Sequence, residues 1–301
     1  MKKFKSSAGD FVVIGWVAAL LASSLTLILW RELGSGEPSW WHWVPATGLT
    51  LLLALTYLSG STRPLRGYII ILGLTFFLGF GGGWQWGLIP LVRSSTLWIE
   101  KVEQTPWALS AVATHLLRLT PALSVLAFLL ARGRSLRDLF LVRGDIDAPV
   151  LPSRLLGMKG PEPWTRLGST FTLVFCAGTL SFLVLATRPS PEMLLRALPL
   201  MPVSLLIAAL NAFNEEFTLR AAPLSELVPA VGERQALLIT TAFFGLGHFY
   251  GIPNGVLGVA LSGFLGWFLG KSILETRGFF WAWLIHFLQD VIIFTFLAMQ
   301  T

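Results

Sequence analysis

The second half of the sequence places ionisable side chains inside strongly apolar segments, where they are energetically costly. A charged residue at the centre of a membrane span costs about 2.5–3.5 kcal/mol on insertion scales, so such residues are paired, buried in a helix bundle or functional. Three apolar segments carry them, at Glu215, Glu216, Arg220, His248, His286 and Asp290. Carboxylates and imidazoles are the usual acids and bases of hydrolytic chemistry. The sequence therefore predicts that these groups share one polar cavity.

The two glutamates at the end of one apolar segment are expected to have different roles. Glu216 and Arg220 are four residues apart, so they share a helix face and can form a supporting pair. Glu215 is rotated by about 100° from Glu216 around the helix. It can therefore point away from that pair, into the cavity, where a carboxylate can act as a general base.

The two histidines of this region are predicted to face the same cavity. His286 and Asp290 are again four residues apart, and a carboxylate on the same face can orient an imidazole. His248 follows Gly245 and Gly247, and small residues of this kind allow a neighbouring helix to approach closely.

The composition indicates how these segments are arranged. The chain has 301 residues, of which 54% are hydrophobic and only 13% are charged, against about 25% charged residues in soluble domains. Such a chain is an integral membrane protein. Its net charge of +6 is interpreted as a topology signal rather than as affinity for nucleic acid. The single cysteine, Cys176, excludes an intrachain disulfide and a cysteine-based zinc site.

We expect an all-α, polytopic fold with eight or nine transmembrane helices. Nine apolar segments approach the length of about 20 residues that crosses a bilayer, at 11–30, 44–61, 68–91, 107–131, 167–187, 194–220, 236–251, 253–270 and 279–299. Within the fourth segment, His115 and Arg118 are expected to serve interhelical hydrogen bonding and topology.

The distribution of lysine and arginine predicts the orientation in the cytoplasmic membrane. Most basic residues outside the apolar segments fall on one side when the N-terminus is placed inside, which leaves the C-terminus outside. The segment 132–166 is rich in Arg, Pro and Gly and is predicted to be a basic cytosolic linker. By this topology Glu215 lies near the cytosolic face, and the cavity opens there.

The ordered motifs resemble the signature of the CAAX-protease and bacteriocin-processing (CPBP/Abi) family of intramembrane proteases. The matching motifs are Glu-Glu-x-x-x-Arg, Phe-x-x-x-His and His-x-x-x-Asp, at Glu215, Glu216, Arg220, Phe244, His248, His286 and Asp290. The resemblance covers roughly residues 165–299. It implies a CPBP/Abi-type helical protease core at 167–301, preceded by the linker at 132–166 and by transmembrane helices without a recognised motif at 1–131.

The resemblance also implies roles for the individual residues. Glu215 would be the general base that activates the hydrolytic water, with assistance from His248. His286 and Asp290 would stabilise the oxyanion or orient water, while the two remaining motif residues would form the supporting pair described above. Asp290 stands where the eukaryotic CAAX endopeptidases carry Asn, which weakens any inference that this chain cleaves prenylated tails.

A metal ion is one of two ways in which such a site could work. Glu215, His248 and His286 could supply the two imidazoles and one carboxylate of a catalytic zinc with one open position. The zincin string His-Glu-x-x-His is absent, and both metal-dependent and metal-free Glu/His mechanisms are consistent with the resemblance.

The expected activity is hydrolysis of a peptide bond in a membrane-associated protein or peptide. Candidate substrates are CAAX-type tails, leader peptides and C-terminal anchors, and the other expected partner is the lipid bilayer. A non-catalytic scaffold or immunity factor of the same family is the main alternative. A transporter is a weaker one, because its usual internal repeats and interrupted helices are not evident. No pattern in the sequence indicates an oligomeric state.

Overall fold

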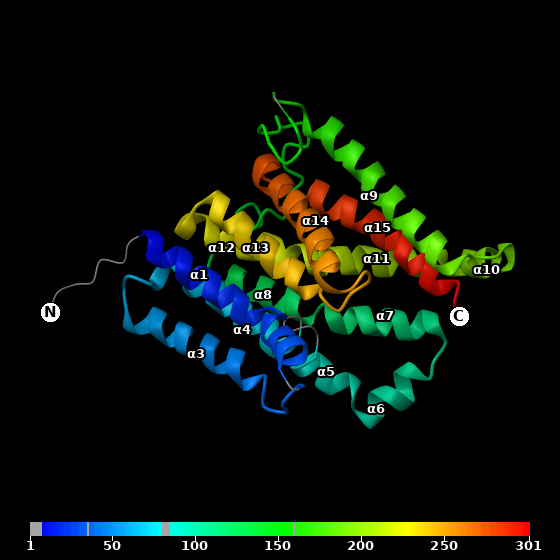
Figure 1. Cartoon of the computed structure of the whole chain (residues 1–301), viewed down its shortest axis with the longest axis horizontal. Coiled ribbons are helices and arrows are strands. Elements are labelled where there is room, and N and C mark those ends of the chain that lie inside the picture. The colour runs from blue at the N-terminus through cyan, green and yellow to red at the C-terminus, as the bar shows by residue number, and fades with distance from the viewer. Residues whose placement is uncertain (1–7, 35, 80–84, 159) are drawn as a thin grey trace. The chain divides into compact units, whose positions relative to one another are not determined.

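The chain folds almost entirely into helices. The computed structural model describes residues 8–34, 36–79, 85–158 and 160–301. The chain is 75% helical, and the described residues contain no β-strand (Figure 1). Long apolar segments adopt helices because a helix satisfies its own backbone hydrogen bonds in lipid. The all-α prediction is confirmed.

The predicted number of membrane-crossing helices is not confirmed. In the described residues five helices are long and apolar enough to cross a membrane: Trp107–Ala131, Trp164–Thr187, Pro191–Val231, Gly255–Thr276 and Phe280–Ala298. A sixth is added if the pair Gly9–Ala22 and Leu25–Leu33, bent by 60°, forms one span. The protein is therefore an integral membrane protein with five or six candidate spans, and the count of eight or nine is not confirmed.

A pair of serines interrupts the first predicted span. Helix α1 (Ala8–Ala22) is followed by α2 (Leu25–Ile28), with Ser23 and Ser24 between them. The Ser23 hydroxyl donates to the carbonyl of Leu20 at 2.8 Å and accepts from the amide of Leu25 at 3.1 Å. These bonds compete with the helical backbone pattern, which is a common cause of helix bending.

Three further predicted spans correspond to helices that are shorter than a bilayer crossing. Helix α3 (Trp43–Leu58) has 16 residues, α4 (Arg66–Leu78) has 13, and α13 (Glu233–Gly247) has 15, whereas a crossing needs about 20. Helix α4 ends at Gly79, whose φ of 87° is left-handed and allows the terminal turn to close.

The chain divides into two compact units, each assembled from several segments. Unit 1 comprises Met1–Arg93, Thr120–Leu139 and Phe217–Lys271. Unit 2 comprises Ser94–Leu119, Phe140–Glu216 and Ser272–Thr301. The sequence-based division into 1–131, 132–166 and 167–301 stays a prediction.

Unit 1 is built around α1 and α4. Helix α1 packs against α3, α4, α12 (Ala222–Val231) and α13, and α4 also packs against α8 (Thr120–Ala131) and α12. This unit also contains α2, η1 (Leu29–Leu33), η2 (Arg63–Leu65), α5 (Leu88–Arg93), η6 (Phe217–Ala221) and most of α14 (Gly255–Thr276).

A buried ionic group joins α12 to the end of α8 in unit 1. Glu226 is buried, and its two carboxylate oxygens each lie 2.7 Å from a guanidinium nitrogen, of Arg132 and of Arg134. Gly67 on α4 makes room for this group, because a Cβ at that position would overlap the Glu226 carboxylate. Two cations thus offset the cost of burying one carboxylate.

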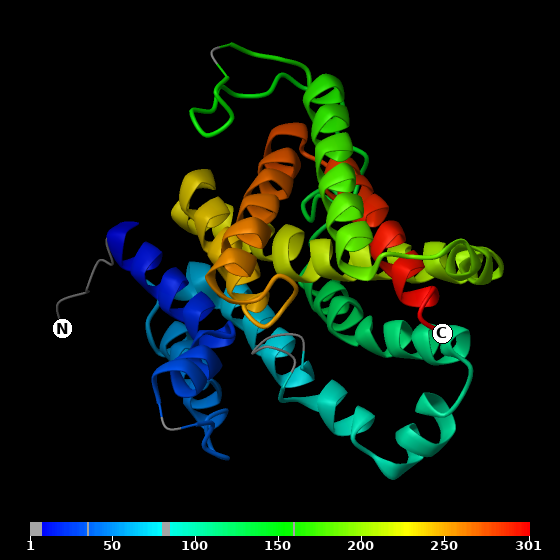
Figure 2. The same ribbon diagram turned by 45° about the vertical axis from the view of Figure 1, so that its right-hand side comes forward.

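Unit 2 is built around α15 (Phe280–Ala298), which packs against α9 (Trp164–Thr187) and α11 (Met201–Glu216). Figures 1 and 2 show α9 running alongside α15. Helix α7 (Trp107–Arg118) packs against α11. The other helices of this unit are α6 (Thr96–Trp98), η4 (Ile99–Glu103), α10 (Pro191–Ala197) and η5 (Leu198–Leu200).

Helix α9 packs along α15 but buries few of its residues. Its buried residues are Trp164, Leu167 and Gly168, and none of its most apolar stretch is buried within the protein. Gly168 lies against the ring of Trp281 on α15, where an added Cβ would approach ring atoms to 2.6 Å. The Trp281 indole is itself held by a 2.9 Å hydrogen bond to the carbonyl of Ile146.

The close approach at Gly168 predicts an asymmetric pair of alanine variants. Gly168→Ala should destabilise the protein by about 1–3 kcal/mol, because the buried Trp281 ring must shift. Gly178→Ala on the same helix is the matched control: an added Cβ there has nothing within 4 Å, and replacing a helical glycine with alanine gains about 0.5–1 kcal/mol. Thermal unfolding in detergent measures both, and equal midpoints for the two variants would contradict the packing described here.

Candidate active site

Helix α11 presents polar residues to a buried face near its C-terminal end. Asn211, Glu215 and Glu216 are all buried, and Glu216 is completely inaccessible to solvent. The facing helix α15 contributes His286 and Asp290, which are also buried. Unit 2 therefore brings together the predicted general base with two other residues predicted for the site.

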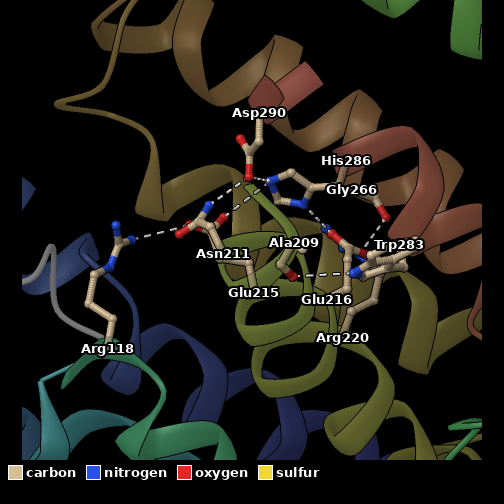
Figure 3. A network of polar contacts seen from close by, with 10 residues as sticks. All are labelled: Arg118, Ala209, Asn211, Glu215, Glu216, Arg220, Gly266, Trp283, His286 and Asp290. Atoms are coloured by element: carbon tan, nitrogen blue, oxygen red, sulfur yellow. Dashed lines mark hydrogen bonds and ion pairs between the residues drawn. The ribbon is translucent and has the colours of Figure 1, made fainter. Parts of the chain in front are cut away.

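The imidazole of His286 is held by a carboxylate from the neighbouring helix. Its Nδ1 lies 2.7 Å from Oε1 of Glu216, a hydrogen bond drawn in Figure 3. The predicted partner Asp290 is farther away, with 3.6 Å between its Oδ2 and His286 Nε2. The i,i+4 spacing does place Asp290 beside the ring, but Glu216 makes the close contact that orients it.

Asn211 connects the two remaining carboxylates and was not identified from the sequence. Its side-chain nitrogen donates to Oε1 of Glu215 at 3.2 Å and to Oδ2 of Asp290 at 2.9 Å (Figure 3). Asn211 precedes Glu215 by four residues, so it shares that helix face. This spacing was the available signal, although an asparagine has no charge to mark it out in an apolar segment.

Arg118 on α7 is the second residue that sequence reasoning did not place in the site. Its Nη2 lies 3.4 Å from Oε1 of Glu215. One turn earlier on α7, His115 is buried, with Nδ1 2.8 Å from the carbonyl of Ala111 and its ring edge-on to Phe294 at 4.9 Å between centroids. Arg118 therefore contacts a motif residue directly, which its sequence position did not indicate.

A further contact joins α15 to α11 beside this group. The indole Nε1 of Trp283 donates to the carbonyl of Ala209 at 3.3 Å (Figure 3). Trp283 precedes His286 by three residues, so both lie on the face of α15 that meets α11. This hydrogen bond helps to hold the register in which His286 reaches Glu216.

The two oxygens of Glu215 have different surroundings. Oε1 is approached by the nitrogen donors of Arg118 and Asn211, at 3.4 Å and 3.2 Å. Oε2 faces Nε2 of His286 at 3.7 Å, beyond hydrogen-bonding distance. A carboxylate oxygen and an imidazole nitrogen thus face one another across a short separation, which is a suitable arrangement for polarising a water molecule.

Two other motif residues, Arg220 and His248, gather around Phe244 in unit 1. The Arg220 guanidinium is buried, lies 4.4 Å above the Phe244 ring and donates through Nε to the carbonyl of Gly266 at 3.1 Å. His248 follows the last turn of α13, with Nδ1 2.9 Å from the carbonyl of Phe244 and 4.5 Å between the ring centroids. The Glu216–Arg220 pair and the assistance of His248 to Glu215 stay predictions.

Comparison with protein-family models gives a match in the second half of the chain. Residues 197–292 match the family model of the type II CAAX prenyl endopeptidases, Rce1-like. The matched region is less than half of the 301 residues. The resemblance inferred from the motifs is confirmed. A search of curated proteins and a search of solved structures gave no significant match.

The Rce1-like region contains every motif residue from Glu215 to Asp290, whereas Arg118 lies outside it. The family is a protease family, which supports protease activity for this chain at the level of the family. The helices α1–α9 precede the matched region, so this comparison does not bear on them.

The described residues of this chain do not form a recognisable metal site. No group of three or more His, Cys, Asp and Glu side chains among them has an arrangement that could hold a metal ion. Of the predicted zinc ligands, Glu215 and His286 are in unit 2, and His286 uses Nδ1 for Glu216. The chemistry considered below therefore includes no step through a metal.

Proposed function

We propose that the protein is an intramembrane endopeptidase in which Glu215 activates the hydrolytic water. The observation that carries this proposal is the asymmetry of the Glu215 carboxylate, whose Oε1 faces two nitrogen donors while Oε2 faces His286. Membership of residues 197–292 in a protease family supports the same reaction class.

In the proposed reaction, Oε2 of Glu215 takes a proton from water as the water oxygen attacks the carbonyl carbon of the scissile bond. The carbon–nitrogen bond of the resulting tetrahedral intermediate then breaks, and Glu215 returns the proton to the leaving nitrogen. One water molecule is consumed, and the carboxylate is regenerated. Burial of the site lowers its effective dielectric, so charge interactions with the intermediate are stronger than in bulk water.

His286 is proposed to orient the water and the developing oxyanion through Nε2. Its Nδ1 contact with Glu216, at 2.7 Å, fixes the direction of the ring. Oδ2 of Asp290 also lies 3.6 Å from Nε2 and is itself held by Asn211 at 2.9 Å. His248 is proposed to assist Glu215, and Arg220 to support Glu216, as the family motifs imply.

The substrate proposed is a membrane-associated protein or peptide: a CAAX-type tail, a leader peptide or a C-terminal anchor. A site built from membrane helices favours a substrate that is itself held at the bilayer. We further propose that the protein resides in the cytoplasmic membrane with the N-terminus inside, the C-terminus outside and the site open to the cytosolic side, on the basis of the basic residues between its apolar segments.

Mass spectrometry of membrane and secreted peptides tests the proposed activity. Cells that carry the wild type are compared with cells that carry Glu215→Gln and with cells that carry no copy. Peptide termini that disappear equally in the last two would establish proteolysis and identify the cleavage site. If Glu215→Gln matches the wild type while deletion has a phenotype, the protein acts by binding, and the scaffold alternative replaces the protease.

Removal of metal ions is expected to leave cleavage unchanged. The reason is that the proposed reaction uses only Glu215, His286 and a water molecule. The measurement is the cleavage rate of purified protein in detergent before and after treatment with a zinc chelator. Loss of activity that added zinc restores would contradict this expectation and would make Glu215, His248 and His286 the first ligands to test.

A further inference from the structure

Arg118 is a charged residue of the site that neither the motifs nor the family match includes. It lies on α7, in the same compact unit as Glu215 and His286. It is 79 residues before Ala197, where the matched region begins. Its Nη2 is 3.4 Å from Oε1 of Glu215. The N-terminal part of the chain thus supplies a cation directly to the proposed general base.

The charges around Glu215 show what this cation can do. Glu216 and Asp290 are carboxylates in the same buried group, linked to it through His286 and Asn211. A third negative charge on Glu215 is unfavourable there unless a cation is near. The Arg118 guanidinium is that nearby cation on the Oε1 side, whereas His286 is on the Oε2 side.

The two oxygens of Glu215 have separate roles in this geometry: one is held by nitrogen donors, and the other faces His286. Arg118 and Asn211 both approach Oε1, so they restrain the carboxylate without covering the oxygen that faces His286. The side chain of Arg118 is 21% exposed, against 11% for Glu215. The arginine is therefore at the more accessible edge of the group, where an added small cation can enter the space left by the side chain in an alanine variant.

We propose that Arg118 is a positioning residue, which holds the charged Glu215 carboxylate by Oε1 so that Oε2 is directed towards the water and His286. This inference rests on the proposed function. It assigns part of the catalytic arrangement to α7, a helix outside the Rce1-like region.

Cleavage kinetics test this proposal. The substrate is a quenched fluorescent peptide that spans the cleavage site found by mass spectrometry. Arg118→Ala should lower kcat by about 10- to 100-fold, since displacement of a reacting group by about 1 Å can have an effect of this size, and KM should not change. Arg118→Lys should retain most of kcat, because it keeps the charge. Guanidinium ions at a non-denaturing concentration should partly restore Arg118→Ala. Arg196→Ala, a change of an exposed arginine in the same unit, is the matched control.

Two results would overturn the proposal: an unchanged kcat in Arg118→Ala, whether or not KM rises, and no rescue by either lysine or guanidinium. Arg118→Gln, which keeps an N–H donor without charge, replaces the alanine variant if that variant does not fold. A thermal double-mutant cycle between Arg118→Ala and Glu215→Gln measures the ion pair without any substrate. If the cycle shows a coupling energy between the two residues but Glu215→Gln is fully active, the proposed function fails. The ion pair is then only structural.

Discussion

Replacing Glu215 with glutamine is expected to slow peptide-bond cleavage by about 10²- to 10⁴-fold, the usual contribution of a general base. The amide has the shape of the carboxylate, and its oxygen can still accept from Arg118 and Asn211, which now contact Oε1. Its nitrogen then takes the place of Oε2, where no proton can be accepted. Folding should therefore be preserved while the base is lost. Cleavage rate per folded molecule, with folded protein measured by size-exclusion chromatography, checks this result.

Glu226→Gln provides the matched control for that experiment. It is also a buried glutamate, but its carboxylate pairs with Arg132 and Arg134 in unit 1 and has no part in the proposed reaction. It should reduce the yield of folded protein, because two guanidinium groups lose their anion, and leave the rate per folded molecule unchanged. If the Glu215→Gln protein is as active as the wild type, the assignment of Glu215 as the general base is wrong.

Replacing His286 with glutamine is expected to have the second largest effect, a decrease in kcat of about 10²- to 10³-fold. Glutamine can still donate to Glu216, so the buried carboxylate keeps a hydrogen-bond partner in place of His286 Nδ1. It cannot at the same time present a second nitrogen at the position of Nε2, between Glu215 and Asp290. The measurement is single-turnover cleavage of the same fluorescent peptide.

Gln289→Ala is the control on the same helix. Gln289 donates to the hydroxyl of Thr179 on α9 at 3.1 Å and contacts none of the carboxylates of the site in the structure described here. This change should lower stability slightly and leave kcat unchanged. Equal losses of kcat in His286→Gln and Gln289→Ala would mean that α15 responds to any polar substitution, and the specific role of His286 would be rejected.

The sequence was sufficient to predict the helical class and the residues that meet on α11 and α15. Charged groups in apolar segments are conspicuous, and their i,i+4 spacing indicates which faces they share. The partners across helices were harder to predict. Glu216 contacts His286, 70 residues away, and its spacing from Arg220 gave no indication of this partner. The i,i+4 spacing indicates which residues are neighbours on one helix. It does not indicate which other helix packs against that face.

Arg118 and Asn211 show two further limits of sequence reasoning. Asn211 carries no charge, so nothing distinguished it from a packing residue, although it bonds two carboxylates. Arg118 does carry a charge, but its position in an N-terminal segment gave no indication that α7 packs against α11. The predicted number of spans is not confirmed for a different reason: hydropathy does not detect the bend at Ser23 and Ser24 after α1 or the early end of α4.

The narrow contact of α9 with its unit has a consequence for how this protein diverges. Beyond Trp164, Leu167 and Gly168, the helix fully buries no residue, although Leu183 packs against the cluster around Phe296 and Thr179 accepts a hydrogen bond from Gln289. On its exposed side, a bilayer requires only sufficient length and apolar character. Exchanges among leucine, valine, isoleucine and phenylalanine on that side are expected to leave packing and fold unchanged. A relative of this protein can therefore share α9 as a helix while differing at many of its exposed positions.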